Sequence, residues 1–125
     1  MHEATIKYGA KHWQSEASVK VTSINPGEIL LEFAGELDIY STPEIEGEFQ
    51  PIIEKERHSH LILDLTDVVY ADTTFLHLLE KLSEDEQRSI SLIAPGGNIV
   101  RHLLDKLGLT AQFVVRDPDV FLTAT

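Results

Sequence analysis

The feature that most constrains the fold of this chain is the nearly continuous apolar run at residues 61–65, Leu-Ile-Leu-Asp-Leu. A half-exposed strand would alternate between apolar and polar residues, and this run does not. Such a run is typical of a strand that is buried on both faces, which places it at the centre of a sheet or pairs it in parallel with its neighbours. The run therefore predicts a central or parallel strand.

The segments around this run alternate between strand and helix patterns. Residues 18–24 and 28–33 alternate apolar and polar side chains, and the Asn-Pro-Gly turn between them predicts an antiparallel hairpin. Apolar residues at helical spacing follow Thr42, Thr73 and Asn98, with further short strands expected at residues 90–93 and 113–115. This order of strands and helices predicts a layered α/β domain.

The first helix has a strong start signal and one awkward residue. Thr42 as the N-cap, with Pro43 at the first helical position, is a favoured helix start. Pro51 removes one backbone hydrogen bond inside this helix, so we expect a kink there.

The length and composition predict one domain without disulfides. A chain of 125 residues with 42% hydrophobic residues can build one core. Residues 1–16 form a weakly patterned extension with a short strand expected at residues 4–8, and residues 17–125 form the domain. The chain has no cysteine, which excludes disulfides, zinc–thiolate sites and thiol catalysis.

The net charge of −11 limits the classes of partner. An acidic chain repels nucleic-acid backbones and anionic lipid, so we expect no nucleic acid and no membrane insertion. The acidity fits a basic protein partner, or it serves only solubility, and both interpretations stay open. The sequence shows no signal peptide and no apolar run long enough to span a bilayer, which predicts a cytoplasmic protein.

The central segment, residues 61–76, reads Leu-Ile-Leu-Asp-Leu-Thr-Asp-Val-Val-Tyr-Ala-Asp-Thr-Thr-Phe-Leu. It resembles the signature of the STAS (anti-sigma factor antagonist) family: a buried strand ending in Asp-Leu-Ser/Thr, then an aromatic residue, Asp-Ser/Thr-Ser/Thr and a helix. Residues 35–38, Gly-Glu-Leu-Asp, and residues 41–43, Ser-Thr-Pro, resemble the family's upstream segment. The resemblance covers the chain from about Ser18 onwards, and it implies a mixed four- to five-stranded sheet with helices packed on it.

The resemblance also implies a function. The chain would be a non-enzymatic anti-sigma factor antagonist that needs no cofactor and acts as a monomer or weak homodimer. Its partner would be an anti-sigma factor with a histidine-kinase-like ATPase fold, which phosphorylates Thr73 and is thereby released. The implied contact surface comprises Asp38, Tyr40, Thr42, Asp72, Thr73 and Thr74.

Several alternatives stay open from the residues alone. Asp72 or Thr73 is a good helix N-cap, a purely structural role. Phe75 stands where many family members have Gly, and its ring either packs inward or alters the partner surface. A STAS scaffold subunit of a signalling or lipid-transport complex would leave Thr73 unmodified. A small α/β enzyme would instead use Asp64, Asp67 or Asp72 as acids and bases.

Other candidate motifs favour structural roles. His58 and His60 lack a clear third metal ligand and are typical of a polar lead-in to a strand. Residues 95–98, Pro-Gly-Gly-Asn, lack the Lys-Ser/Thr of a phosphate-binding loop and predict a turn. His77 and His102 fall off the apolar stripes and are expected to be exposed. Trp13 either anchors a partner or pins the N-terminal extension. We expect no metal site and no catalytic residue.

Overall fold

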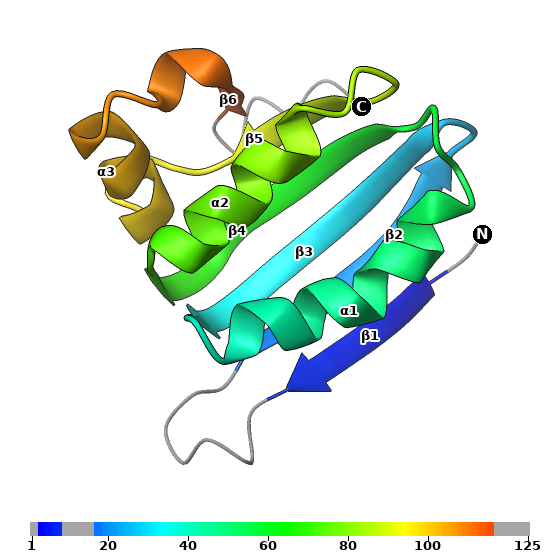
Figure 1. Ribbon diagram of the computed structural model, residues 1–125, viewed down its shortest axis with the longest axis horizontal. Coiled ribbons are helices and arrows are strands. Elements are labelled where there is room, and N and C mark those ends of the chain that lie inside the picture. The colour runs from blue at the N-terminus through cyan, green and yellow to red at the C-terminus, as the bar shows by residue number, and fades with distance from the viewer. Residues whose placement is uncertain (1–2, 9–16, 117–125) are drawn as a thin grey trace.

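The fold is a mixed sheet of six strands with helices packed against it (Figure 1). The computed structural model describes residues 3–8 and 17–116, so Trp13 lies outside the described residues. The elements in chain order are β1 (Glu3–Tyr8), β2 (Ala17–Asn25), β3 (Glu28–Leu37), α1 (Ser41–Glu54), β4 (His60–Ala71), α2 (Thr73–Ser83), β5 (Ser89–Ile93), α3 (Ile99–Lys106), the 3₁₀ turn η1 (Thr110–Gln112) and β6 (Val114–Arg116).

The strands lie in chain order across the sheet. β1, β2 and β3 pair antiparallel, and β3 to β6 pair parallel. The predicted hairpin and the predicted central parallel strand are both confirmed, and β4 is buried on both faces over residues 61–63. The α/β class with a mixed sheet is also confirmed. The strand expected at residues 4–8 joins the sheet as β1, which brings the number of strands to six.

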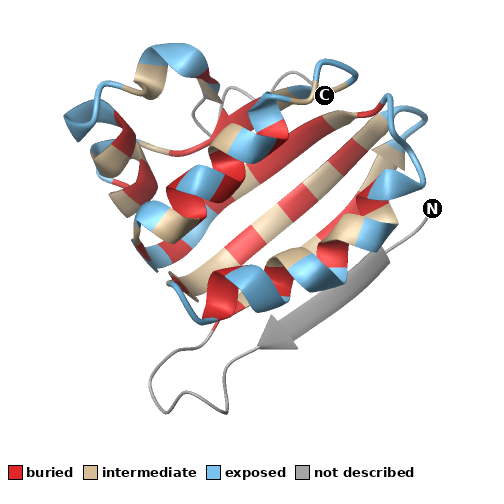
Figure 2. Cartoon of the chain, in the orientation of Figure 1, coloured by how far each residue is buried: buried red, intermediate tan, exposed pale blue. Residues whose placement is uncertain are grey.

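Helices α1 and α2 cover the same face of the sheet (Figure 1), and the core that they form with it also includes Val100 and Leu104 of α3. Buried positions alternate with half-buried ones along β3, as Figure 2 shows. The ring of Phe33 meets those of Phe49 and Phe75 edge-on, with centroids 5.9 and 5.4 Å apart. Such pairs add about 0.5–1.5 kcal/mol each beyond the area they bury. Phe75 is fully buried, so its ring packs inward and is not part of the surface.

The start of α1 corrects one prediction. Thr42 is not the N-cap, because the helix begins at Ser41 and Thr42 is a buried residue of its first turn. The capping acceptor comes from earlier in the chain: a side-chain oxygen of Asp38 accepts hydrogen bonds from the N–H groups of Tyr40 and Ser41. Pro43 still lies in the first turn, where its missing N–H costs nothing.

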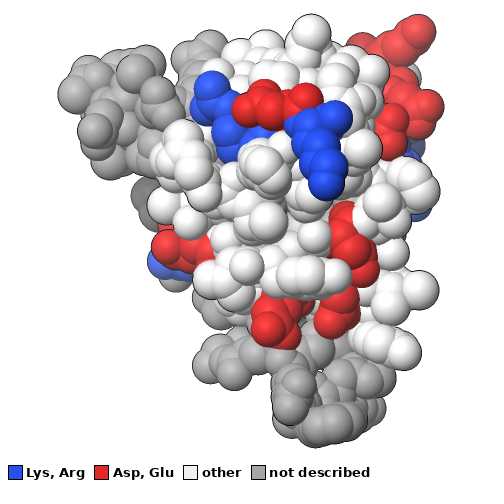
Figure 3. Space-filling view, turned by 90° about the vertical axis from the view of Figure 1, so that its left-hand side faces the viewer, with Lys and Arg blue, Asp and Glu red and all other residues white. Residues whose placement is uncertain are grey.

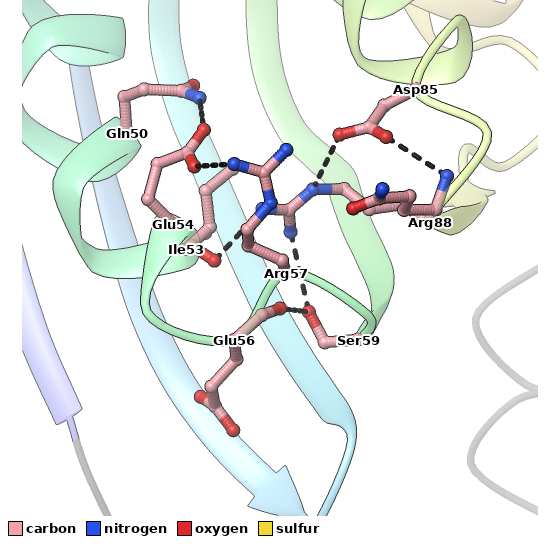
Figure 4. A network of polar contacts seen from close by, with 9 residues as sticks. Gln50, Ile53, Glu54, Glu56, Arg57, Ser59, Asp85 and Arg88 are labelled. Atoms are coloured by element: carbon pink, nitrogen blue, oxygen red, sulfur yellow. Dashed lines mark hydrogen bonds and ion pairs between the residues drawn. The ribbon is translucent and has the colours of Figure 1, made fainter.

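The C-terminal end of α1 is held by Arg88, whose side chain is only 2% exposed (Figure 4). Its guanidinium donates hydrogen bonds to the carbonyl oxygen of Ile53 (3.0 Å), to Oγ of Ser59 (3.4 Å) and to Oδ2 of Asp85 (3.3 Å). The positive charge therefore sits beside the last carbonyl groups of α1, where the helix dipole favours a cation. This network joins α1 to the loops before β4 and β5.

Candidate functional site

The turn from β4 into α2 exposes the residue that the family resemblance singled out. Asp72 is the N-cap of α2, because its Oδ1 accepts a hydrogen bond of 2.9 Å from the N–H of Thr74. Thr73 is the first helical residue and is exposed, and Thr74 is half-buried. The capping role therefore belongs to Asp72, and the hydroxyl-bearing side chain of Thr73 lies at the surface.

The turn from β3 into α1 is held by a reciprocal pair, Asp38 and Ser41. Oδ1 of Asp38 accepts from the N–H of Ser41 (2.8 Å), and Oγ of Ser41 accepts from the N–H of Asp38 (3.0 Å). The same hydroxyl donates to the carbonyl oxygen of Glu36 (2.7 Å). Sequence reasoning missed Ser41. Its signal was the Asp-x-x-Ser spacing, which permits hydrogen bonds between side chain and backbone in both directions.

These two turns lie side by side because β3 and β4 are parallel neighbours. Leu37 pairs with Ala71 at the end of the two strands, and the N–H of Asp72 donates to the carbonyl oxygen of Leu37 (3.3 Å). Asp38 and Thr73 therefore follow paired strand ends at one edge of the sheet. The structure brings together five of the six residues that the resemblance implied: Asp38, Tyr40, Asp72, Thr73 and Thr74.

Thr42 is the exception among these residues. It is 3% exposed, and its Oγ1 is buried without a hydrogen-bond partner among the described residues. Thr42 therefore supports the turn from inside, and a partner on the surface does not reach its hydroxyl.

Exposed apolar side chains surround the same edge. Val69 and Tyr70 in β4 are 69% and 47% exposed, and Ile39 and Tyr40 after β3 are 61% and 59% exposed. The pairing of β3 with β4 shifts by one residue at Val69, which is a β-bulge. A bulge turns two consecutive side chains to the same side of a strand. Sequence reasoning named only Tyr40 of these four, because the bulge depends on the pairing of two strands and leaves no local pattern.

The family model of the STAS domain matches residues 20–123. The chain belongs to the STAS domain family. Solved structures support the fold of this STAS domain. An anti-sigma factor antagonist from Mycobacterium paratuberculosis is 21% identical, with a TM-score of 0.72 over 86% of this chain and 92% of that one.

Two further structures similar to this STAS domain are of the anti-sigma factor antagonist SpoIIAA. Its unphosphorylated form is 18% identical, with a TM-score of 0.64 over 83% of this chain and 92% of that one. The phosphorylated form of the Bacillus protein is 14% identical, with a TM-score of 0.61 over 85% and 97%. A search of curated proteins found no match.

The other candidate residues of the STAS domain lie elsewhere or have structural partners. Oδ1 of Asp64 accepts from both the N–H (3.0 Å) and the hydroxyl (2.6 Å) of Thr66, as a turn-forming aspartate does. The ring of His60 lies between the hydroxyls of Ser89 (2.5 Å) and Ser91 (3.0 Å). Within the described part of the chain, no three His, Asp or Glu residues are grouped to hold a metal ion.

The predicted turn at residues 95–98 is confirmed, and it borders a hollow. The N–H of Asn98 donates to the carbonyl oxygen of Pro95 (3.0 Å), and Asn98 then caps α3. The hollow has a volume of about 360 Å³ and is lined by Gly96, Gly97, Ile99, Arg101, His102 and Asp105. None of the strand-end carboxylates considered for catalysis lines it.

In the described residues, no helix is long and apolar enough to span a bilayer.

Proposed function

We propose that this STAS domain is an anti-sigma factor antagonist that is switched by phosphorylation of Thr73. Its partner is an anti-sigma factor with a histidine-kinase-like ATPase fold. The unphosphorylated chain binds this partner in the cytoplasm and so frees a sigma factor. The observation that carries the proposal is the exposed Thr73 at the first position of α2, beside the turn that holds Asp38. A kinase can reach this side chain without unfolding the domain.

The charges around Thr73 explain how a phosphate would act. Phosphorylation adds about −1.5 to −2 charges and three acceptor oxygens. A helix N-terminus alone would tolerate an anion, but the carboxylate of Asp72 already accepts from the N–H of Thr74 there. The carboxylate of Asp38 caps α1 in the neighbouring turn. A phosphate would therefore add charge to an already acidic edge and force a closely packed partner away, with the fold unchanged.

The related structures support this choice of function over a scaffold role. The similar protein SpoIIAA is an anti-sigma factor antagonist solved in unphosphorylated and phosphorylated forms. The proposal gives this chain the same kind of regulation at Thr73. The chain then acts by binding alone, and the kinase supplies the ATP chemistry.

The test is to incubate the purified chain with a purified histidine-kinase-like anti-sigma factor and Mg-ATP, and to measure the intact mass. We expect one added phosphate, which Thr73→Ala abolishes and Thr74→Ala retains. Thr73→Glu should weaken the complex with the anti-sigma factor. An unmodified wild-type chain that still binds the partner would favour the scaffold role instead, and a phosphate retained by Thr73→Ala would contradict the assignment of the residue.

A further inference from the structure

We infer that Ile39, Tyr40, Val69 and Tyr70 form the apolar centre of a docking surface, which binds a protein that carries an apolar depression beside a basic patch. The inference rests on the proposed function, because the protein in question is the anti-sigma factor. The four apolar side chains would supply the binding energy, and the charges around them indicate on which side the basic patch of the partner lies.

The side chains of Ile39, Tyr40, Val69 and Tyr70 are exposed to solvent. Between 47% and 69% of each is exposed, and they are four of the six large apolar side chains that are exposed among the described residues; the other two, Leu107 and Val114, lie after α3 and in β6. Val69 and Tyr70 are consecutive residues at the bulge of β4. Tyr70 pairs with Glu36 near the end of β3, and Ile39 follows Glu36 by three residues, so both groups lie where β3 and β4 end. Single exposed apolar residues are ordinary, but a group of them at one site marks an interaction surface. Tyrosines are also enriched at the centres of protein interfaces.

The charges on this face are unevenly spread (Figure 3). Negative side chains gather over the ends of β3 and β4 and the starts of α1 and α2, whereas the positive side chains at the top lie over α3, with a negative side chain between them. Glu36 near the end of β3, Asp38 in the turn after it and Asp72 before α2 are acidic residues of these strand ends, and α3 carries Arg101 and Lys106 together with Asp105. Opposite charges attract across an interface. The basic patch of the partner should therefore lie over the strand ends and not over α3.

The same charges argue against a second copy of this chain as the occupant. In a two-fold dimer the same surface patch of both copies meets, so the acidic residues around the patch of one copy would lie close to those of the other. Each copy carries a net charge of −11, and the carboxylates of Asp38 and Asp72 lie in the two turns that follow β3 and β4. Pairing two such surfaces would bring like charges together, and a basic partner would not.

The docking surface also explains why a phosphate on Thr73 would be effective. An apolar centre excludes water when the partner is bound, and a phosphate placed beside it must lose its hydration and needs space that a closely packed partner does not leave. Thr73 follows Tyr70 by three residues along the chain and is the exposed first residue of α2. Phosphorylation of Thr73 would then prevent binding without a change in the conformation of the domain.

The test measures binding of the purified anti-sigma factor by biolayer interferometry. We expect Val69→Ser and Tyr70→Ser each to raise Kd about tenfold or more, as for residues at the centre of an interface. The matched control is Val114→Ser, which removes an equally accessible side chain (51% exposed) from the edge strand β6 and should leave Kd unchanged. Glu36→Lys should lower the association rate constant, and Lys106→Glu should raise it.

The outcomes separate this inference from the proposed function. A wild-type chain that binds no anti-sigma factor overturns both. Tight binding retained by both serine variants overturns the apolar centre alone and leaves the phosphorylation switch standing. A dimer of the wild-type chain that dissociates in Tyr70→Ser, seen by analytical ultracentrifugation, would make a second copy the occupant and overturn the inference. Circular dichroism confirms that each variant is folded.

Discussion

The N–H of Asp72 donates a hydrogen bond to the carbonyl oxygen of Leu37, and this bond joins the start of α2 to the end of β3. The two turns at the candidate site are therefore joined by a backbone hydrogen bond that does not depend on the side chain of Thr73. This separates residues that maintain the fold from residues that are available to a partner.

Removing the N-cap of α2 should cost more than removing the proposed phosphoacceptor. We expect Asp72→Ala to lower the free energy of unfolding by about 1 kcal/mol, because the N–H of Thr74 loses its acceptor. Thr73→Ala should change it by less than about 0.5 kcal/mol, since the residue is exposed. Urea denaturation followed by circular dichroism measures both, with Asp72→Asn as the control that keeps an acceptor. Equal losses in the two alanine variants would show that Thr73 shares the capping.

Truncating Phe75 should strongly destabilise the domain. We expect Phe75→Ala to cost about 3–5 kcal/mol, because the ring is fully buried and meets Phe33 edge-on. Phe75→Leu should cost clearly less, since it keeps most of the buried volume. Urea denaturation gives both values, and Val69→Ala serves as an exposed control within about 0.5 kcal/mol. A loss below about 1 kcal/mol for Phe75→Ala would mean that the ring is not part of the core.

The buried Arg88 should matter more than its exposed neighbour Arg57. Arg88→Met leaves the carbonyl oxygen of Ile53 and the hydroxyl of Ser59 without this donor, so we expect a loss of about 2–3 kcal/mol. Arg57→Ala breaks only a 3.4 Å ion pair with Glu54, in which the side chains are 58% and 44% exposed, and should cost less than about 0.5 kcal/mol. Thermal and urea unfolding compare the two. Similar losses would contradict the assigned network.

Asp85 should contribute to the stability of the fold only while it is ionised. The hydrogen bond from the N–H of Gln87 lowers the pKa of Asp85, and Arg88 acts in the same direction against the opposing effect of desolvation. Because the folded pKa is the lower one, ionised Asp85 stabilises the fold above the unfolded value of about 3.9. That contribution disappears as the pH falls through the folded pKa.

The check on Asp85 is a pair of unfolding curves for the wild-type chain and Asp85→Asn at several pH values. We expect the wild-type chain to be more stable at pH 7 and the difference to shrink as the pH falls below about 3.9. Glu86→Gln, in the same loop, is the matched control for removal of one negative charge, and it should show no such convergence. A difference that does not vary with pH would remove the role of ionised Asp85.

The family resemblance pointed to the candidate site, but not to all of the side chains exposed around it. The pattern at residues 61–76 predicted the start of α2, and the likeness to the family pointed to Thr73 as the candidate phosphoacceptor. It did not reveal Ser41, Ile39, Val69 or Tyr70. Their roles depend on how β3 pairs with β4 and where the bulge falls. Thr42 was placed wrongly for a related reason, since Asp38 reached across the turn to cap α1.

The sequence by itself determined the local elements of this protein: the β2–β3 hairpin, the buried strand β4, the start of α2 at Thr73 and the turn before α3. Periodicity, turn residues and caps act over a few residues, so a short segment contains all the information they need. Only the tertiary structure decided that Phe75 points into the core, that Arg88 holds the end of α1 and that four apolar side chains stay exposed. Those outcomes arise from contacts between segments about 30 or more residues apart, and they exist only once the sheet has formed its register.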